Sequence, residues 1–180
     1  MTVLRKALKN AKRQCLIADN VASSEYVDGI TVHKHEPKAL SQRQVRELVT
    51  LASVIEREAK VPGERPIIAS VFYNRLALGM PLQSDPTAQY NFAGETMRAV
   101  AAVRAPSAFN TYEFAGLPPG PIANPGLSSI RAALYPAHTD YLYFVARNDG
   151  THIFSRSFKE HEHAIEEVRR MAAQAHRPKS

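Results

Sequence analysis

Prolines are concentrated in the middle of this chain, and they limit where helices and strands can form. Seven of its 12 prolines lie between residues 81 and 125, together with polar Asn, Gln and Tyr side chains. These seven are Pro81, Pro86, Pro106, Pro118, Pro119, Pro121 and Pro125. Proline fixes φ and lacks the N–H that helices and sheets require, so this middle section is predicted to be rich in loops. Long ordered loops in a compact domain are more often functional than idle.

Helical patterns precede the proline-rich section. Ser41 and Gln44 form a capping-box signature, and apolar residues follow at helical spacing as far as Ala59. A second helix is expected to start near Pro66, a favourable first-turn residue, and to end at Gly79, a favourable C-terminal cap.

Different patterns follow the prolines. A short helix is predicted over about residues 127–134, and "YLYFVARNDGTHIFSRS" predicts a β-hairpin around an Asn-Asp-Gly turn. An amphipathic helix is predicted from about Phe158 to Ala175.

The net charge of +6 raises the question of nucleic-acid binding. Residues 1–13 and 169–180 together hold nine basic residues and no acidic one, which leaves 14 basic against all 17 acidic residues between them. The body is therefore slightly acidic. Terminal charge runs are usually solvated extensions, so we expect no nucleic-acid partner.

The cysteine, the histidines and the apolar runs indicate whether to expect a disulfide, a metal site or a membrane segment. The single Cys15 excludes an internal disulfide and a cysteine-based metal cluster. His161 and His163 are two residues apart, whereas helical metal pairs need a spacing of three or four, and "HKHE" at residues 33–36 resembles a ligand cluster only superficially. We therefore expect no metal site. The longest apolar run near the N-terminus, "CLIA", is far too short for an export signal or an anchor.

Two glutamates in "LASVIEREAK" are the strongest candidates for chemistry. On a helical wheel of about 100° per residue with Val45 at zero, Glu56 falls at about 20°, inside the apolar stripe. Glu58 falls at about 220°, beside Glu47, and is predicted to be a solvated surface residue. A carboxyl group on a core-facing stripe needs a raised pKa or a dedicated partner. Glu56 is thus either a general acid or a structural ion pair, for example with Arg75.

Other polar residues admit two interpretations each. Asp85 in "QSDPT" could be the second carboxylate of a glycoside-cleaving site, but a role as cap of a helix starting at Pro86 is favoured. Asn110 and Tyr112 lie in a proline-bounded loop where amide and hydroxyl groups could bind sugar hydroxyls, although turns also contain such residues for ordinary reasons.

Several motifs together resemble one known family. They are "LASVIEREA", "ERPIIASVFYNRLALGMPLQSDPT", "FNTYEFAGLPPGPIANPG" and "ALYPAHTDYLYFVARNDGTHIFSRSFKEH". In this order they are similar to the catalytic domain of the endolytic murein transglycosylases, the MltG or YceG-like family. The resemblance covers about residues 40–168 and implies an α+β domain with a lysozyme-like arrangement around the glutamate helix, proline-rich cleft loops, and a C-terminal hairpin and helix.

The resemblance also implies an activity. Such enzymes cleave the β-1,4 bond between N-acetylmuramic acid and N-acetylglucosamine within peptidoglycan strands and leave 1,6-anhydro ends, without a cofactor. The first glutamate of the family's motif is expected to be the single acid and base, which carries over to Glu56. The substrate-binding candidates are then Gln83, Asp85, Asn110, Tyr112 and Asn124.

The resemblance also implies domain limits and a location, and two alternative functions stay open. Residues 38–170 are expected to form the catalytic domain, between a basic N-terminal extension, 1–37, that matches neither a membrane anchor nor a glycan-binding module, and a basic tail, 171–180. The family implies the cell envelope as location, with glycan strands and the peptidoglycan synthesis machinery as partners, and membrane association only through a segment absent from this sequence. The alternatives are a lysozyme-type hydrolase using Glu56 and Asp85, and a catalytically silent glycan-binding protein.

Overall fold

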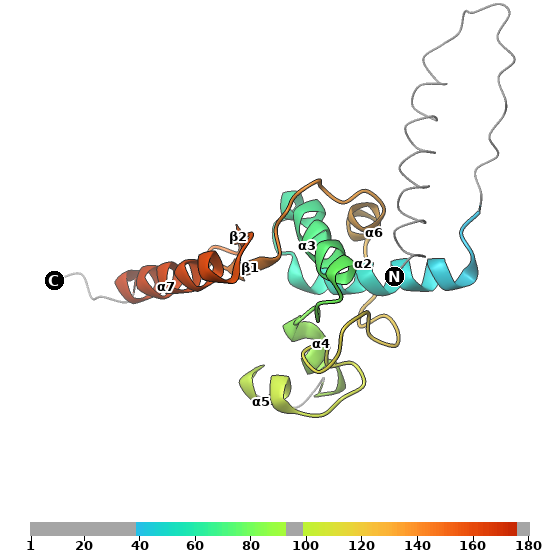
Figure 1. The fold of residues 1–180 in the computed structure, drawn as a ribbon, viewed down its shortest axis with the longest axis horizontal. Helices are drawn as coiled ribbons and strands as arrows, with labels where there is room; N and C mark the ends of the chain where they lie inside the picture. Colours follow the sequence, from blue (N-terminus) through green and yellow to red (C-terminus); the bar gives the residue numbers. More distant parts are fainter. Residues whose placement is uncertain (1–38, 93–98, 176–180) are drawn as a thin grey trace, which may run out of the picture. The chain divides into compact units, whose positions relative to one another are not determined.

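The computed structural model describes residues 39–92 and 99–175 (Figure 1). The chain divides into two units, Met1–Arg46 and Glu47–Ser180, and each is described by itself. Only residues 39–46 of the first unit are described. The predictions about Cys15, the "HKHE" segment and the extension 1–37 therefore lie outside the described residues.

The capping box at the start of the first described helix is confirmed. Helix α2 spans Gln42–Glu58. The Ser41 amide donates to Gln44 Oε1 at 2.9 Å, and the Gln44 amide donates to Ser41 Oγ at 3.3 Å. Each side chain thus satisfies a backbone N–H that has no partner within the helix.

Helix α3, Arg65–Leu78, follows a short 3-10 turn at Pro62–Glu64. It ends at Gly79, whose φ of 70° lies in the left-handed region that glycine adopts without steric cost. Helix α6, Leu127–Leu134, packs against α3, and Figure 1 shows both next to α2. The core between these helices is apolar. Its largest fully buried members are Leu51, Val54, Ile55, Ile68, Phe72 and Leu82.

The proline-rich section forms short elements joined by loops, as predicted. Helix α4 spans Asp85–Gln89, a 3-10 turn spans Tyr90–Phe92, and helix α5 spans Ala99–Arg104. The loop before α6 has no regular structure, but its Ile122 amide donates to the buried Ser53 Oγ of α2 at 2.9 Å. A side chain of α2 therefore holds the loop in place.

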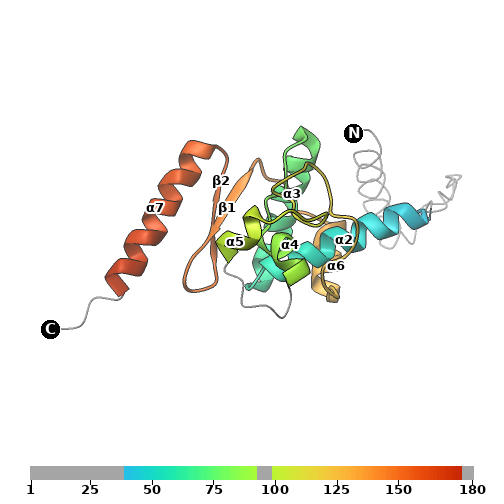
Figure 2. The same cartoon turned by 90° about the horizontal axis from the view of Figure 1, so that it is seen from below.

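The predicted hairpin and final helix are also confirmed. Strands β1, Tyr143–Ala146, and β2, His152–Ser155, pair antiparallel. Gly150, with φ of 87°, allows the chain to reverse between them. Helix α7, Phe158–Ala175, packs against both strands, and Figure 2 shows it beside them.

The α+β class is therefore confirmed, while the lysozyme-like arrangement stays a prediction. Among residues 39–92 and 99–175 no helix is both long and apolar enough to cross a membrane. Within the same ranges, no three side chains of His, Cys, Asp and Glu come together in a way that could hold a metal ion.

Candidate active site

Glu56 joins α2 to the start of α6. Its Oε2 accepts hydrogen bonds from the Ser129 hydroxyl at 2.6 Å and from the Gly126 amide at 3.0 Å. Arg65 Nη2 lies 3.8 Å from Oε1. The bond from Ser129, with smaller effects of Gly126 and Arg65, lowers the pKa of this carboxyl below its usual value. Glu56 is thus an ionised carboxylate with structural partners, which is unsuited to donating a proton at neutral pH.

Glu58 lies in the opposite kind of environment. Its side chain is only partly accessible, and Ser84 Oγ donates a hydrogen bond to Oε1 at 2.6 Å. Loss of solvation raises the pKa of Glu58 to about 7, the nearby charge of Asp85 adds to this rise, and the Ser84 bond opposes it. A carboxyl group that is protonated in part at neutral pH is suited to general acid catalysis.

The wheel-based prediction for these two glutamates was wrong. Leu51 and Val54 lie on the wheel at about 240° and 180°, on either side of Glu58. They are 1% and 0% exposed, so Glu58 lies on a buried face of the helix. All residues from Thr50 to Ile55 are buried, and this end of α2 has no single apolar stripe. The expected partner was also wrong, because Glu56 pairs with Arg65 rather than with Arg75.

A buried network of hydroxyl groups positions Ser84. Its amide donates to Thr111 Oγ1 at 3.1 Å, and its carbonyl accepts from Thr87 Oγ1 at 2.6 Å. The Thr111 amide donates to Thr87 Oγ1 at 3.2 Å, and all three residues are at most 1% exposed. The sequence interpretation missed Ser84, although it directly precedes the Asp-Pro pair in "QSDPT".

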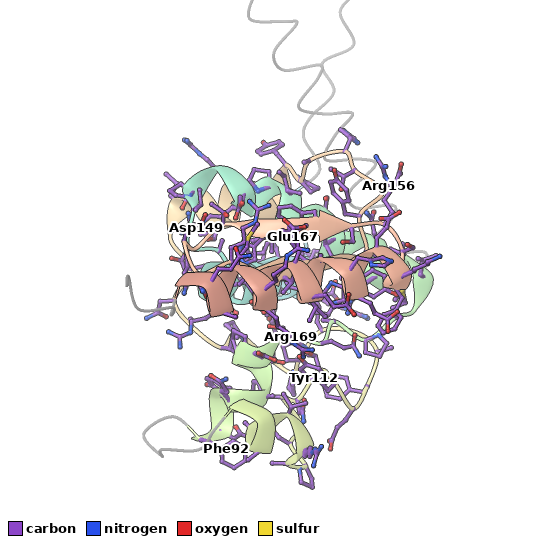
Figure 3. All side chains as sticks on the ribbon, turned by 90° about the vertical axis from the view of Figure 1, so that its left-hand side faces the viewer. Phe92, Tyr112, Asp149, Arg156, Glu167 and Arg169 are labelled. Carbon is purple, nitrogen blue, oxygen red and sulfur yellow. The ribbon has the colours of Figure 1, made fainter. Side chains whose placement is uncertain are left out.

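Asp85 does not cap a helix, contrary to the favoured interpretation. Ser84 occupies the N-cap position and Asp85 is the first residue of α4. The exposed Asp85 carboxylate accepts a 2.6 Å hydrogen bond from the hydroxyl of Tyr112, which is labelled in Figure 3. Loss of solvation and then this bond raise the pKa of Tyr112, which therefore stays protonated. Tyr112 thus holds a carboxylate close to Glu58.

Gln83 directly precedes Ser84, whose hydroxyl binds Glu58. It is exposed, and its φ of 51° makes it the one residue other than glycine with positive φ among the described residues. The buried Arg75 donates from Nη1 to Gln83 Oε1 at 2.9 Å and thereby orients the amide. Such strained backbone is maintained only where the surroundings enforce it, often at functional sites.

The two other predicted substrate-binding residues differ in their exposure. Asn110 is 0% exposed, and its Nδ2 donates to the carbonyls of Val103 and Ala105. Its Oδ1 accepts from the Tyr112 amide, so Asn110 orders the loop from within. Asn124 is exposed on the loop that reaches Glu56 through Gly126. The structure thus places Asp85 and Tyr112 close to Glu58, and it gives Asn110 a structural role in its loop.

Two known proteins are similar in sequence to most of this chain. A protein described as endolytic murein transglycosylase of Bacillus subtilis (strain 168) is 46% identical over 138 residues, which cover 76% of this chain and 38% of the relative. A second, of Streptococcus pneumoniae serotype 2 (strain D39), is 35% identical over 130 residues, which cover 68% and 24%. The chain therefore spans less than two fifths of the length of these relatives.

A solved structure and a family model agree with these relatives. The crystal structure of a putative YceG-like protein from Listeria monocytogenes matches with a TM-score of 0.63 and 46% identity, covering 67% of this chain and 40% of that one. The model of the YceG-like family matches residues 2–167, a range that includes most of the N-terminal extension, whose boundary at residue 37 stays a prediction. This match extends over most of the sequence, and the chain belongs to the YceG-like family.

Proposed function

We propose that this chain carries the active site of a peptidoglycan lytic transglycosylase in which Glu58 is the single general acid and base. The observation that supports this most directly is the desolvated carboxyl of the half-buried Glu58, with its pKa raised to about 7. The names of the relatives supply the substrate class. A lysozyme-like arrangement of the cleft around α2 is part of the proposal.

The chemistry requires one group that first donates and then accepts a proton. Protonated Glu58 donates its proton to the oxygen that joins N-acetylmuramic acid to N-acetylglucosamine, as the bond from that oxygen to the anomeric carbon breaks. The resulting carboxylate takes the proton from the C6 hydroxyl of the muramic acid while O6 bonds to the anomeric carbon. The 1,6-anhydro ring closes, Glu58 is protonated again, and no water is consumed.

The neighbours of Glu58 supply orientation and charge. Ser84 directs the carboxyl, and Asp85, held by Tyr112, disfavours ionisation of Glu58. A hydrolase would instead use Asp85 as its second carboxylate, and its products would carry reducing ends. Glycan strands as substrate imply a location in the cell envelope, near the peptidoglycan synthesis machinery.

The products of cleavage test this proposal. Purified uncrosslinked glycan strands would be digested with the full 180-residue chain and analysed by mass spectrometry. Products lighter by one water molecule than hydrolysis products are expected, since an anhydro ring replaces the reducing end. Reducing ends would favour the hydrolase, and intact strands would favour a glycan-binding protein without catalytic activity.

The pH dependence of cleavage should follow Glu58. Because the acid must be protonated, kcat/KM is expected to fall as pH rises through about 7. Asp85→Asn keeps an acceptor for Tyr112 but removes the charge that raises the pKa of Glu58, so this fall should move to lower pH. Glu113→Gln, at an exposed acid of the neighbouring loop, is the control and should leave the profile in place. An unmoved profile in Asp85→Asn would contradict the assigned role of Asp85.

A further inference from the structure

We propose that Tyr143, Phe158 and His161, together with the side-chain amide of Gln83, form a binding subsite for one hexopyranose ring of a glycan strand. The inference rests on the proposed function for its ligand class. It extends the site from Glu58 and its neighbours to the hairpin and the first turns of α7, to which the sequence analysis assigned no part in binding.

Three aromatic rings from two elements gather at this position. The rings of Tyr143 on β1 and His161 on α7 stack with centroids 5.2 Å apart and planes 21° apart. Phe158 meets Tyr143 at 5.9 Å and His161 at 6.4 Å. Phe158 is nevertheless 58% exposed, in the turn of α7 that begins just after Arg156, which is labelled in Figure 3. An exposed ring beside two half-buried ones is typical of binding surfaces rather than of a closed core.

Contacts connect this cluster to the proposed acid. The guanidinium carbon of Arg75 lies 5.0 Å from the centre of the Tyr143 ring, within the range of a cation–π contact. Arg75 Nη1 in turn donates to Gln83 Oε1, and Gln83 directly precedes Ser84, the residue that binds Glu58. Tyr143 and Glu58 are thus joined by continuous contacts. The proposed subsite therefore belongs to the same side-chain network as the proposed acid.

Gln83 supplies the polar group that an aromatic platform lacks. Because its Oε1 accepts from Arg75, its Nε2 hydrogens remain for an acceptor outside the protein. Its side chain is exposed and its backbone has the strained φ of 51°. The hydroxyl and acetamido oxygens of an amino sugar are acceptors of the required kind. A small number of oriented polar groups beside apolar surface is the usual composition of a ligand site.

His161 behaves as a flat neutral ring in this cluster. Its Nδ1 is buried without a hydrogen-bond partner in the described structure, and the ring stacks on Tyr143. Burial and then the charge of Arg75 lower the pKa of His161, which keeps the ring uncharged at neutral pH. An uncharged ring face suits the apolar C–H face of a pyranose.

Binding measured without turnover tests the subsite. The full chain carrying Glu58→Gln would be titrated by calorimetry with the tetramer of β-1,4-linked N-acetylglucosamine. Phe158→Ala and Gln83→Gly, added separately, should each weaken binding about five- to tenfold, since one stacked ring or one oriented donor is lost. Glycine is chosen at position 83 because it accepts the positive φ. Leu127→Ala, at a similarly exposed apolar side chain on α6, should leave the affinity unchanged.

A second measurement separates binding from folding. In 1H–15N spectra of the Glu58→Gln chain, the tetramer should shift the side-chain amide signals of Gln83, assigned by their loss in Gln83→Gly. Unshifted signals, unchanged affinities in both variants, or no binding of either the tetramer or purified glycan strands would each overturn the subsite. Failure of the proposed function would look different, with strands left uncut by the unmutated chain while the Gln83 signals still shift.

Discussion

Replacing Glu58 with Gln is expected to lower the rate of strand cleavage by about 10²- to 10⁴-fold, because the variant can neither donate nor accept the proton. The amide keeps the size of the side chain and can still accept the hydrogen bond from Ser84. The folded state should therefore persist, with a melting temperature close to that of the unmutated chain. Rates would be measured from the appearance of anhydro ends in digests of glycan strands.

Glu56→Gln is the matched control, two residues away on the same helix. It weakens the bonds from Ser129 and Gly126 and removes the ion pair with Arg65, so a loss of about 1 kcal/mol in stability is expected. Cleavage should continue at temperatures where the variant is folded. Loss of cleavage in a folded Glu56 variant, with activity kept in Glu58→Gln, would return the acid role to Glu56.

Arg75→Met should produce the largest loss of stability, about 3–5 kcal/mol in the free energy of unfolding. Arg75 is 6% exposed and donates to the carbonyls of Leu142, Pro81 and Leu82 as well as to Gln83 Oε1. Methionine fills much of the volume but leaves these buried and partly buried acceptors without their donor. Because the bonds join α3 to the hairpin and to the α4 loop, both connections should loosen together.

Urea denaturation of the Arg75→Met chain measures this effect. Arg131→Met is the control, since Arg131 is exposed on α6, and its stability should change by no more than about 0.5 kcal/mol. Equal stability of the two variants would show that the Arg75 network contributes little to folding.

Element boundaries could be predicted because their signals are local. The capping box at Ser41 and Gln44, the left-handed Gly79 and the turn glycine Gly150 each act through nearby backbone, and each was identified from neighbouring residues alone. The proline-rich section was likewise assigned to loops because proline excludes long regular elements wherever it stands.

The site could be predicted only in part, because it depends on contacts between distant segments. A wheel represents a helix with one buried face, whereas the end of α2 is buried all round from Thr50 to Ile55. Which glutamate lies near a hydroxyl donor depends on where α4 and α6 pack, and Ser84 and Ser129 are far from α2 in sequence. Arg75 likewise reaches Leu142 across 67 positions of the chain.

The loop between residues 118 and 126 is held at two points by side chains one turn apart on α2. Ser53 accepts from the Ile122 amide and Glu56 from the Gly126 amide. Irregular surface segments usually tolerate tags, inserted domains and proteolytic nicking. Here an inserted linker between Ile122 and Gly126 would pull one backbone amide from its acceptor, so an engineer who seeks a permissive position should choose another loop.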